Sequence, residues 1–324
     1  MIKSSILCIF YHVLVLGLNF ARGADGAKNA KLQFDLSNNT LLPSDCGRDP
    51  TEIAIDPRFS DLSERIVGGV RTDIGEFPWI AHLIYSTPNG QSASCGGSLI
   101  NHRYVLTAAH CLKGTIIPIG WTLSKVRLGE YDTKTNPDCI KDDANNEVCA
   151  DDAITVGIEK KIAHENYSPP SRDQKYDIAL LRLDRDIPFT NYIKPICLPP
   201  NDAIGTKLFV AGWGKTENAS SSNIKLKVSV PLVDKQQCER KYSRKGVTLG
   251  FGQICAGGVR GKDSCSGDSG GPLMNEEKGS DGIGRWTAVG VVSFGPTPCG
   301  FPGWPAIYTR VIDFIPWILS KMEP

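Results

Sequence analysis

Short apolar runs separated by turn residues dominate the chain from residue 66 onward. They are four to eight residues long and rich in Val, Ile, Leu and Tyr, with Gly, Pro and Asn between them. This pattern predicts an antiparallel all-β protein, with strands near residues 79–85, 104–107, 178–183, 208–211 and 287–293.

The carboxyl end has a different pattern. Apolar residues recur there at three- and four-residue spacing behind Asp313, which predicts an amphipathic α-helix with Pro316 in its first turn. The apolar face consists of Val311, Phe314, Ile315, Ile318 and Met322.

The amino-terminal residues 1–23 combine an early Lys3, an apolar stretch over residues 6–18, and small residues before Ala24. This pattern predicts a secretory signal peptide, because the stretch is shorter than the roughly 20 residues that span a bilayer; a retained anchor is the alternative. Residues 24–65 are polar and hold a single cysteine, Cys46. We interpret them as a loose propeptide, with an unprocessed irregular arm as the alternative, and residues 66–324 as one domain.

Composition narrows the function classes. The 36 Lys and Arg balance 35 Asp and Glu, which argues against nucleic acid or an anionic membrane as the main partner. Eleven cysteines are many for a cytosolic enzyme, and loss of Cys8 with the signal leaves an even ten. We therefore expect a secreted, extracellular protein with five disulfides. Three sequons, at Asn38, Asn166 and Asn218, are candidate glycosylation sites; Pro169 weakens the second.

Three motifs carry candidate chemistry: TAAHC with His110, DIAL with Asp177, and GDSGGP with Ser269. Singly, they could be a core histidine, a turn residue and a polar loop residue. Together, in this order, they predict nucleophilic acyl transfer, in which the imidazole takes the serine proton and the carboxylate fixes the imidazole. The flanking glycines allow the backbone N–H groups of Gly267 and Ser269 to form an oxyanion hole.

With these motifs the sequence resembles the chymotrypsin-like serine proteases. The resemblance covers residues 66–324 and includes, in family order, IVGG, CGGSL, TAAHC, DIALL, AGWG, SCSGDSGGPL and VSFG. It implies two packed six-stranded antiparallel β-barrels with a carboxy-terminal α-helix, and no cofactor for catalysis. It also implies activation by cleavage after Arg65, which frees the amino group of Ile66 to pair with buried Asp268. The alternative is that Asp268 caps a loop and Arg65 is ordinary surface.

The resemblance assigns a primary specificity pocket. Asp263 would form its base, which implies cleavage after Arg or Lys, and the remaining substrate-binding residues would be Ser264, Ser293, Gly295 and Ala306. Ala306 replaces the glycine usual in trypsin-like members. Its methyl group should crowd the base and favour Arg over Lys.

The family positions also imply the disulfide pairs. They are Cys46 with Cys197, Cys95 with Cys111, Cys139 with Cys149, Cys238 with Cys255, and Cys265 with Cys299. The pair of Cys46 and Cys197 would keep the propeptide attached as a light chain. The pair of Cys139 and Cys149 resembles an extra bridge that is a feature of arthropod clip-domain cascade proteases. A clip domain needs six cysteines and residues 24–65 hold one, so the chain resembles a relative without that domain.

The loop after residue 129 could hold a structural Ca²⁺ through Glu130, Asp132, Thr135 and Asp138, or it could be a solvated acidic loop. The leading hypothesis is a secreted zymogen of a trypsin-like endopeptidase in an extracellular cascade such as innate immunity, melanization or Toll signalling. Its partners would be an activating protease, a zymogen substrate and a serpin inhibitor. The alternatives are a digestive trypsin and a non-catalytic protease homologue that acts as a binding cofactor.

Overall fold

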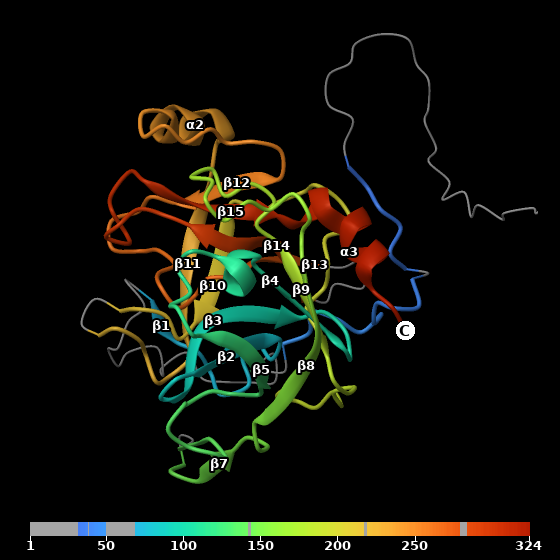
Figure 1. Cartoon of the computed structure of the whole chain (residues 1–324). Helices are drawn as coiled ribbons and strands as arrows, with labels where there is room; N and C mark the ends of the chain where they lie inside the picture. The colour runs from blue at the N-terminus through green and yellow to red at the C-terminus, as the bar shows by residue number, and fades with distance from the viewer. Residues whose placement is uncertain (1–31, 38, 50–68, 142–143, 217–218, 279–283) are drawn as a thin grey trace, which may run out of the picture. The chain divides into compact units, whose positions relative to one another are not determined.

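Two β-sheets organise the chain (Figure 1). The structure is a computed structural model that describes residues 32–37, 39–49, 69–141, 144–216, 219–278 and 284–324. Residues 32–324 group as one unit by their contacts, separately from residues 1–31, which lie outside the described ranges.

The first sheet closes into a six-stranded antiparallel barrel. In order around the barrel, its strands are β2 (Ile80–Thr87), β3 (Gly90–Leu99), β4 (Tyr104–Thr107), β9 (Ala179–Leu183), β8 (Ile154–Ala163) and β5 (Thr122–Leu128).

The second sheet also closes, because β11 pairs with β12 as well as with β10. Its order is β11 (Leu226–Val233), β10 (Lys207–Gly212), β13 (Pro272–Lys278), β14 (Gly284–Phe294), β15 (Pro305–Arg310) and β12 (Gln253–Gly257), with the short β1 (Val70–Arg71) added beside β11. The predicted pair of six-stranded antiparallel barrels is confirmed.

The remaining elements are short. A two-stranded hairpin projects from the loop after residue 129, and the helices are few. The hairpin consists of β6 (Cys139–Lys141) and β7 (Glu147–Cys149). The helices are α1 (His110–Lys113), α2 (Lys235–Ser243), a 3-10 helix (Val311–Phe314) and α3 (Ile315–Lys321). All five predicted apolar runs coincide with strands, namely β2, β4, β9, β10 and β14.

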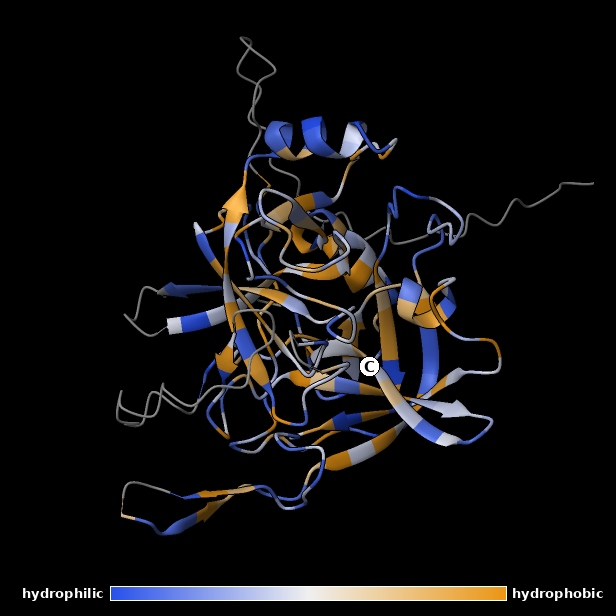
Figure 2. Cartoon of the chain, turned by 90° about the vertical axis from the view of Figure 1, so that its left-hand side faces the viewer, coloured by the Kyte–Doolittle hydropathy of each residue, from blue (hydrophilic) through white to orange (hydrophobic). Residues whose placement is uncertain are grey.

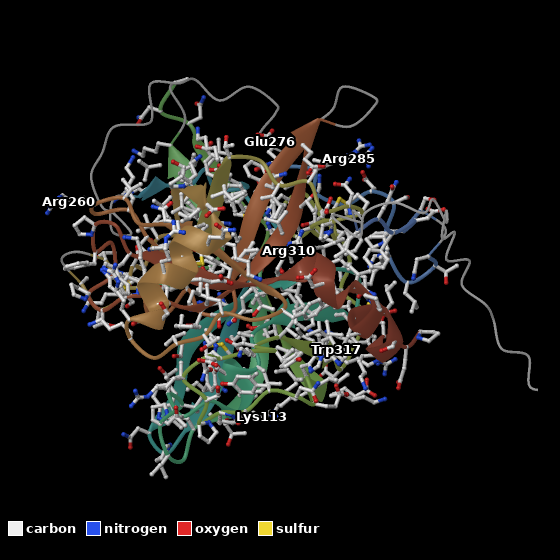
Figure 3. All side chains as sticks on the ribbon, turned by 90° about the horizontal axis from the view of Figure 1, so that it is seen from above. Lys113, Arg260, Glu276, Arg285, Arg310 and Trp317 are labelled. Atoms are coloured by element: carbon white, nitrogen blue, oxygen red, sulfur yellow. A yellow bond between two sulfur atoms is a disulfide. The ribbon has the colours of Figure 1, made fainter. Side chains whose placement is uncertain are left out.

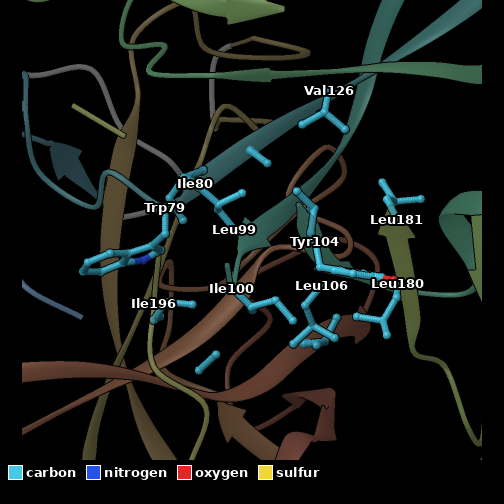
Figure 4. Packing of buried hydrophobic residues seen from close by; sticks show 14 of the residues in the cluster. Trp79, Ile80, Leu99, Ile100, Tyr104, Leu106, Val126, Leu180, Leu181 and Ile196 are labelled. Carbon is cyan, nitrogen blue, oxygen red and sulfur yellow. The ribbon is translucent and has the colours of Figure 1, made fainter. Parts of the chain in front are cut away.

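The apolar side chains of the strands fill both barrels and the space between them. Every residue of β4 and β9 is buried, which explains why these strands are continuous apolar runs without alternation. Trp79 is fully buried, and its indole N–H points to the sulfur of Met274 in the other barrel, 3.1 Å away. Figure 4 shows part of this cluster around Leu99, Leu106 and Val126. In Figure 2 the strands carry most of the hydrophobic colour, whereas α2 is largely hydrophilic.

The carboxy-terminal helix forms as predicted, except that its first turn is a 3-10 helix. All five residues of the predicted apolar face are buried. The helix belongs to the second half of the chain but packs on the first barrel: Trp317, labelled in Figure 3, donates to the Glu165 carboxylate at 2.8 Å, and Lys321 pairs with the same carboxylate. The helix therefore fastens the two barrels together.

The described part of the amino-terminal arm is packed on the domain, so the expectation of a loose segment is wrong for residues 32–37 and 39–49. The Phe34 N–H donates to the Pro200 carbonyl at 2.7 Å. The Gly47 N–H donates to the Pro195 carbonyl, and the Gly47 carbonyl accepts the Trp286 N–H, both at 2.8 Å. Gly47 has a φ of 67°, and a side chain there would lie 2.3 Å from the Trp286 carbonyl oxygen. Close backbone pairing to the second barrel, which polarity along the sequence does not reveal, explains the difference.

Candidate active site

His110 and Asp177 form the centre of the candidate site. His110 begins α1 directly after β4, and Asp177 lies two residues before β9, which pairs with β4. The Asp177 carboxylate is fully buried; one oxygen lies 2.7 Å from His110 Nδ1 and the other accepts the His110 backbone N–H at 2.8 Å. These contacts fix the ring with the proton on Nδ1, so that Nε2 is the acceptor. Among the described residues, Nε2 has no hydrogen-bond partner.

Two hydroxyl groups from the second barrel complete the surroundings of Asp177. Ser293 on β14 donates to a carboxylate oxygen at 2.5 Å, and Thr309 on β15 donates to the backbone carbonyl at 2.7 Å. Ser293 was predicted to bind substrate, whereas its side chain contacts the Asp177 carboxylate. A role of the Ser293 backbone in substrate binding stays a prediction. Thr309 was missed, because no local motif marks a residue 132 positions from its partner.

Ser269 lies in a tight turn beside His110. Its carbonyl accepts the Gly96 N–H at 2.8 Å, and the disulfide between Cys95 and Cys111 ties this part of β3 to the residue after His110. The next residue, Gly270, has a φ of 80°, and a side chain there would lie 2.2 Å from the Thr107 hydroxyl. The structure thus places the serine turn against the segment that leads into His110. In the described part of the chain, no hydrogen bond joins Ser269 to His110.

The predicted oxyanion donors lie in the same turn. Gly267 has a φ of 104°, and a side chain there would lie 2.8 Å from the Gly214 Cα, so only glycine fits. Hydrogen bonds from Asp268 N–H to the Cys265 carbonyl and from Gly271 N–H to the Asp268 carbonyl close the turn. That the N–H groups of Gly267 and Ser269 form an oxyanion hole stays a prediction.

Asp268 is a buried carboxylate held only by backbone groups among the described residues. It accepts N–H groups from Gly214 and Cys265, both at 2.9 Å. Burial raises its pKa to about 6, against the lowering effect of these hydrogen bonds. Since burying an unpaired carboxylate is costly, this position favours a cationic partner. Arg65 and Ile66, the predicted activation residues, lie outside the described residues.

The Asp263 carboxylate is fully buried, and only one of its two oxygens accepts a hydrogen bond from the described residues. One oxygen accepts the Gly300 N–H at 3.0 Å; the other has no partner in the described ranges. Burial raises its pKa to about 6. The neighbouring Ser264 hydroxyl lies 3.2 Å from the Tyr308 hydroxyl. An unpaired buried carboxylate oxygen at the base of a site suits a cationic ligand group.

Two of the predicted substrate-binding residues, Gly295 and Ala306, lie next to each other. Ala306 is buried on β15, and a methyl group built on Gly295 would lie 3.2 Å from the Ala306 Cβ. The Ala306 methyl therefore lies against the Gly295 backbone. Its effect on the choice between Arg and Lys stays a prediction.

The predicted calcium residues lie in one loop, where several of their oxygens already accept hydrogen bonds. Both oxygens of Asp138 accept hydrogen bonds, from the Tyr131 and Asp132 N–H groups and from the Thr135 hydroxyl at 2.6 Å. Arg127 pairs with the Glu130 carboxylate. Within the described ranges, the three carboxylates of this loop do not gather within 4.8 Å of one another. Burial raises the pKa of Glu130, and so does the Asp138 carboxylate that faces it. We derive no role for a metal, and the calcium site stays a prediction.

All five predicted disulfides are present. The S–S distances lie between 1.96 and 2.06 Å, and the bridge between Cys46 and Cys197 anchors the packed amino-terminal arm. Of the three sequons, only Asn166 lies in the described ranges; its side chain is exposed, whereas Asn38 and Asn218 lie outside. Glycosylation stays a prediction.

The sequence matches a protein family and several known proteins. The family model described as Trypsin matches residues 66–318. The chain belongs to the trypsin family. CLIP domain-containing serine protease HP8 of Bombyx mori is 47% identical over 282 residues, which cover 85% of this trypsin-family chain and 74% of that protein. Melanization protease 1 of Drosophila melanogaster is 47% identical over 270 residues, with 81% and 67% coverage.

A solved structure shares the fold of this trypsin-family chain. The crystal structure of the Drosophila Grass clip serine protease of the Toll pathway superposes with a TM-score of 0.71 and 35% identity, covering 90% of this chain and 78% of that one. None of the helices in the described ranges combines the length and the apolar character needed to span a bilayer.

Proposed function

We propose that the chain is the secreted zymogen of a trypsin-like serine endopeptidase that cleaves after Arg or Lys in an extracellular proteolytic cascade. One observation supports the catalytic part: Asp177 holds the His110 ring so that Nε2, which has no partner among the described residues, is left as an acceptor. The Ser269 turn lies against the segment that leads into His110. This arrangement is what a serine hydroxyl needs in order to lose its proton at neutral pH.

The proposed reaction follows from these positions. His110 Nε2 takes the proton of the Ser269 hydroxyl as Oγ attacks the scissile carbonyl carbon, and the N–H groups of Gly267 and Ser269 stabilise the oxyanion. The imidazolium then gives its proton to the leaving amine, which leaves an acyl-enzyme. A water molecule attacks the ester, again with His110 as base, and releases the new carboxyl group together with the regenerated serine.

The specificity and the activation step rest on two buried carboxylates. The unpaired oxygen of Asp263 supports recognition of a guanidinium or ammonium group at the base of the pocket. Asp268 would receive the amino group that cleavage after Arg65 creates on Ile66, and the new ion pair would order the serine turn. An upstream protease is therefore required as a partner.

The cascade role is supported by the relatives. Melanization protease 1 and the Grass protease of the Toll pathway carry these processes in their names. A protein zymogen is the proposed substrate, and a serpin is the proposed inhibitor.

Covalent labelling tests the proposal. A fluorophosphonate probe should label the chain after cleavage at Arg65 and label it far more slowly before. The Ser269→Ala variant should stay unlabelled in both states, and the Arg65→Gln variant should resist activation by a trypsin-like protease. Absence of labelling after verified cleavage would overturn the catalytic proposal and leave a non-catalytic binding homologue.

A further inference from the structure

The segment of residues 173–177, which ends in the triad carboxylate, has an unfavourable backbone. Gln174 and Tyr176 have φ angles of 45° and 60°, a region that residues other than glycine seldom adopt. The Ile178 N–H donates to the Tyr176 carbonyl at 2.9 Å, so the chain turns tightly around Asp177. Such a backbone persists only where its surroundings hold it in place.

Part of the surroundings belongs to the first barrel, where the Tyr167 hydroxyl donates to the Gln174 side chain at 2.7 Å. The backbone carbonyls of the segment, however, accept hydrogen bonds from side chains of the second barrel. The amide nitrogen of Gln253 on β12 donates to the Asp173 carbonyl at 2.7 Å and reaches the Gln174 carbonyl at 3.5 Å. The Thr309 hydroxyl on β15 donates to the Asp177 carbonyl at 2.7 Å. Gln253 and Thr309 are 3% and 1% exposed, so water does not compete for either bond.

These two side chains form a matched pair. Gln253 and Thr309 are direct partners in the register of β12 and β15, and side chains of directly opposite residues project from the same face of a sheet. The backbone of the next residue, Arg310 in Figure 3, donates to Gly252 at 2.8 Å, which locks the same register. The paired residues Gln253 and Thr309 of the second barrel therefore contact the two ends of the segment.

The other contacts of Gln253 fix its orientation. Its amide oxygen accepts the Gly250 N–H at 2.9 Å, which leaves the amide nitrogen directed at the segment. Asp173 is held from the same side, because its carboxylate accepts the Thr248 N–H at 2.9 Å. The second barrel thus supplies hydrogen-bond donors along the segment.

We propose that Gln253 and Thr309 are positioning residues that hold the Asp173–Asp177 segment from the second barrel and thereby keep the Asp177 carboxylate aimed at His110. The inference rests on the proposed protease function, because it concerns how the triad is held. It makes the alignment of two first-barrel residues depend on the second barrel, which also carries Ser269.

The test uses the activated, disulfide-intact chain with the variants Thr309→Val, Thr309→Ser and Gln253→Met. We expect Thr309→Val to lower kcat on the order of 10- to 100-fold with KM nearly unchanged, since small displacements of a catalytic group cost this much. Thr309→Ser should restore most of the rate, because it keeps the hydroxyl. Gln253→Met should act in the same direction, and the double variant should lose less than the product of the single losses, because both act on one segment.

The matched control is Ser124→Ala, which removes a hydroxyl that donates to the Ile84 carbonyl at 3.1 Å within the first barrel. It should leave kcat unchanged. A lower melting temperature for Thr309→Val and Gln253→Met, with kcat and KM like those of Ser124→Ala, would overturn the proposal and make the contacts merely structural.

A second readout does not need turnover. The short hydrogen bond between His110 Nδ1 and Asp177 should give a low-field signal in proton NMR. This signal should weaken or shift in Thr309→Val and recover in Thr309→Ser. If the wild type neither labels nor turns over, the proposed function fails while this signal still decides the positioning role. An unchanged signal in both Thr309→Val and Gln253→Met would refute that role.

Discussion

The pH dependence of stability in the uncut chain should report on Asp268. Its carboxylate is 1% exposed, accepts two backbone N–H groups and has no cation partner among the described residues. Burial raises its pKa from 3.8 to about 6. The perturbation is Asp268→Asn, which keeps the shape and removes the titration.

The magnitude follows from the shift of about two pKa units. At roughly 1.4 kcal/mol per unit, the carboxylate makes the uncut wild type about 3 kcal/mol less stable above pH 6 than below pH 4. The sign follows because the folded state binds the proton more tightly than the unfolded state, so the free energy of unfolding falls as pH rises through this window. Asp268→Asn removes this fall. Since part of the change already occurs below pH 4, its stability relative to wild type should rise by about 2 kcal/mol between pH 4 and pH 7.

The assay is urea unfolding at several pH values from 4 to 7, with disulfides intact. The amide must place its NH₂ against one of two N–H donors, a cost that does not vary with pH and therefore does not alter the trend. Burial is the main cause of the raised pKa of Asp263 and is the same in both proteins, whereas the smaller contribution from the Asp268 charge is lost in the variant, so most of the Asp263 effect cancels in the difference. Asp35→Asn is a control for the sign, since bonds from Ser37 lower the pKa of that exposed carboxylate.

Cleavage after Arg65 offers a second comparison. If the Ile66 amino group pairs with Asp268, the charged carboxylate becomes the favoured form, and the cut wild type should lose the decline in stability between pH 4 and pH 6. Parallel stability curves for uncut wild type and Asp268→Asn from pH 4 to 7 would refute the reasoning, because they would mean that Asp268 is already ionised and compensated.

Three further predictions concern the pocket, the light chain and the acidic loop. Ala306→Gly should raise kcat/KM for Lys relative to Arg substrates by about 10-fold, since it removes the methyl that lies against Gly295; an unchanged ratio in matched peptide substrates would contradict this. After cleavage at Arg65, Cys197→Ala should release the light chain on a non-reducing denaturing gel, whereas loss of the bridge between β6 and β7 should not; a light chain that stays attached in Cys197→Ala would disprove the link. Calcium and EDTA should leave the melting temperature unchanged, because Arg127 already pairs with Glu130; a rise with calcium would restore the calcium site.

The sequence predicted the strands well where they are short and wholly apolar. β4 and β9 are buried on every residue, so composition alone marks them. The carboxy-terminal helix was equally readable, because its face repeats at helical spacing and all of that face is buried. The sequence could not show that this helix packs on the first barrel, because the ion pair from Lys321 to Glu165 joins residues far apart in the chain.

The site divides in the same way. Local motifs identified His110, Asp177 and Ser269, because glycines and small residues around a reactive side chain leave a mark in sequence. Motifs could not assign the side chain of Ser293 to Asp177, nor find Gln253 and Thr309, since these contacts depend on strand register in a sheet closed by distant segments. They also suggested calcium for a loop in which the fold directs hydrogen-bond donors at the Asp138 carboxylate, a contact that the motif did not reveal.

The sequence by itself therefore determined the apolar strands, the cysteine count and the residue types of the chemistry, all of which are properties of short segments. Only the tertiary structure decided which hydroxyl reaches Asp177, how residues 32–37 and 39–49 pack, and that one oxygen of Asp263 stays without a partner among the described residues. The physical reason is that hydrogen bonds and burial depend on distance in space, and two closed barrels bring together residues as far apart as Asp177 and Thr309.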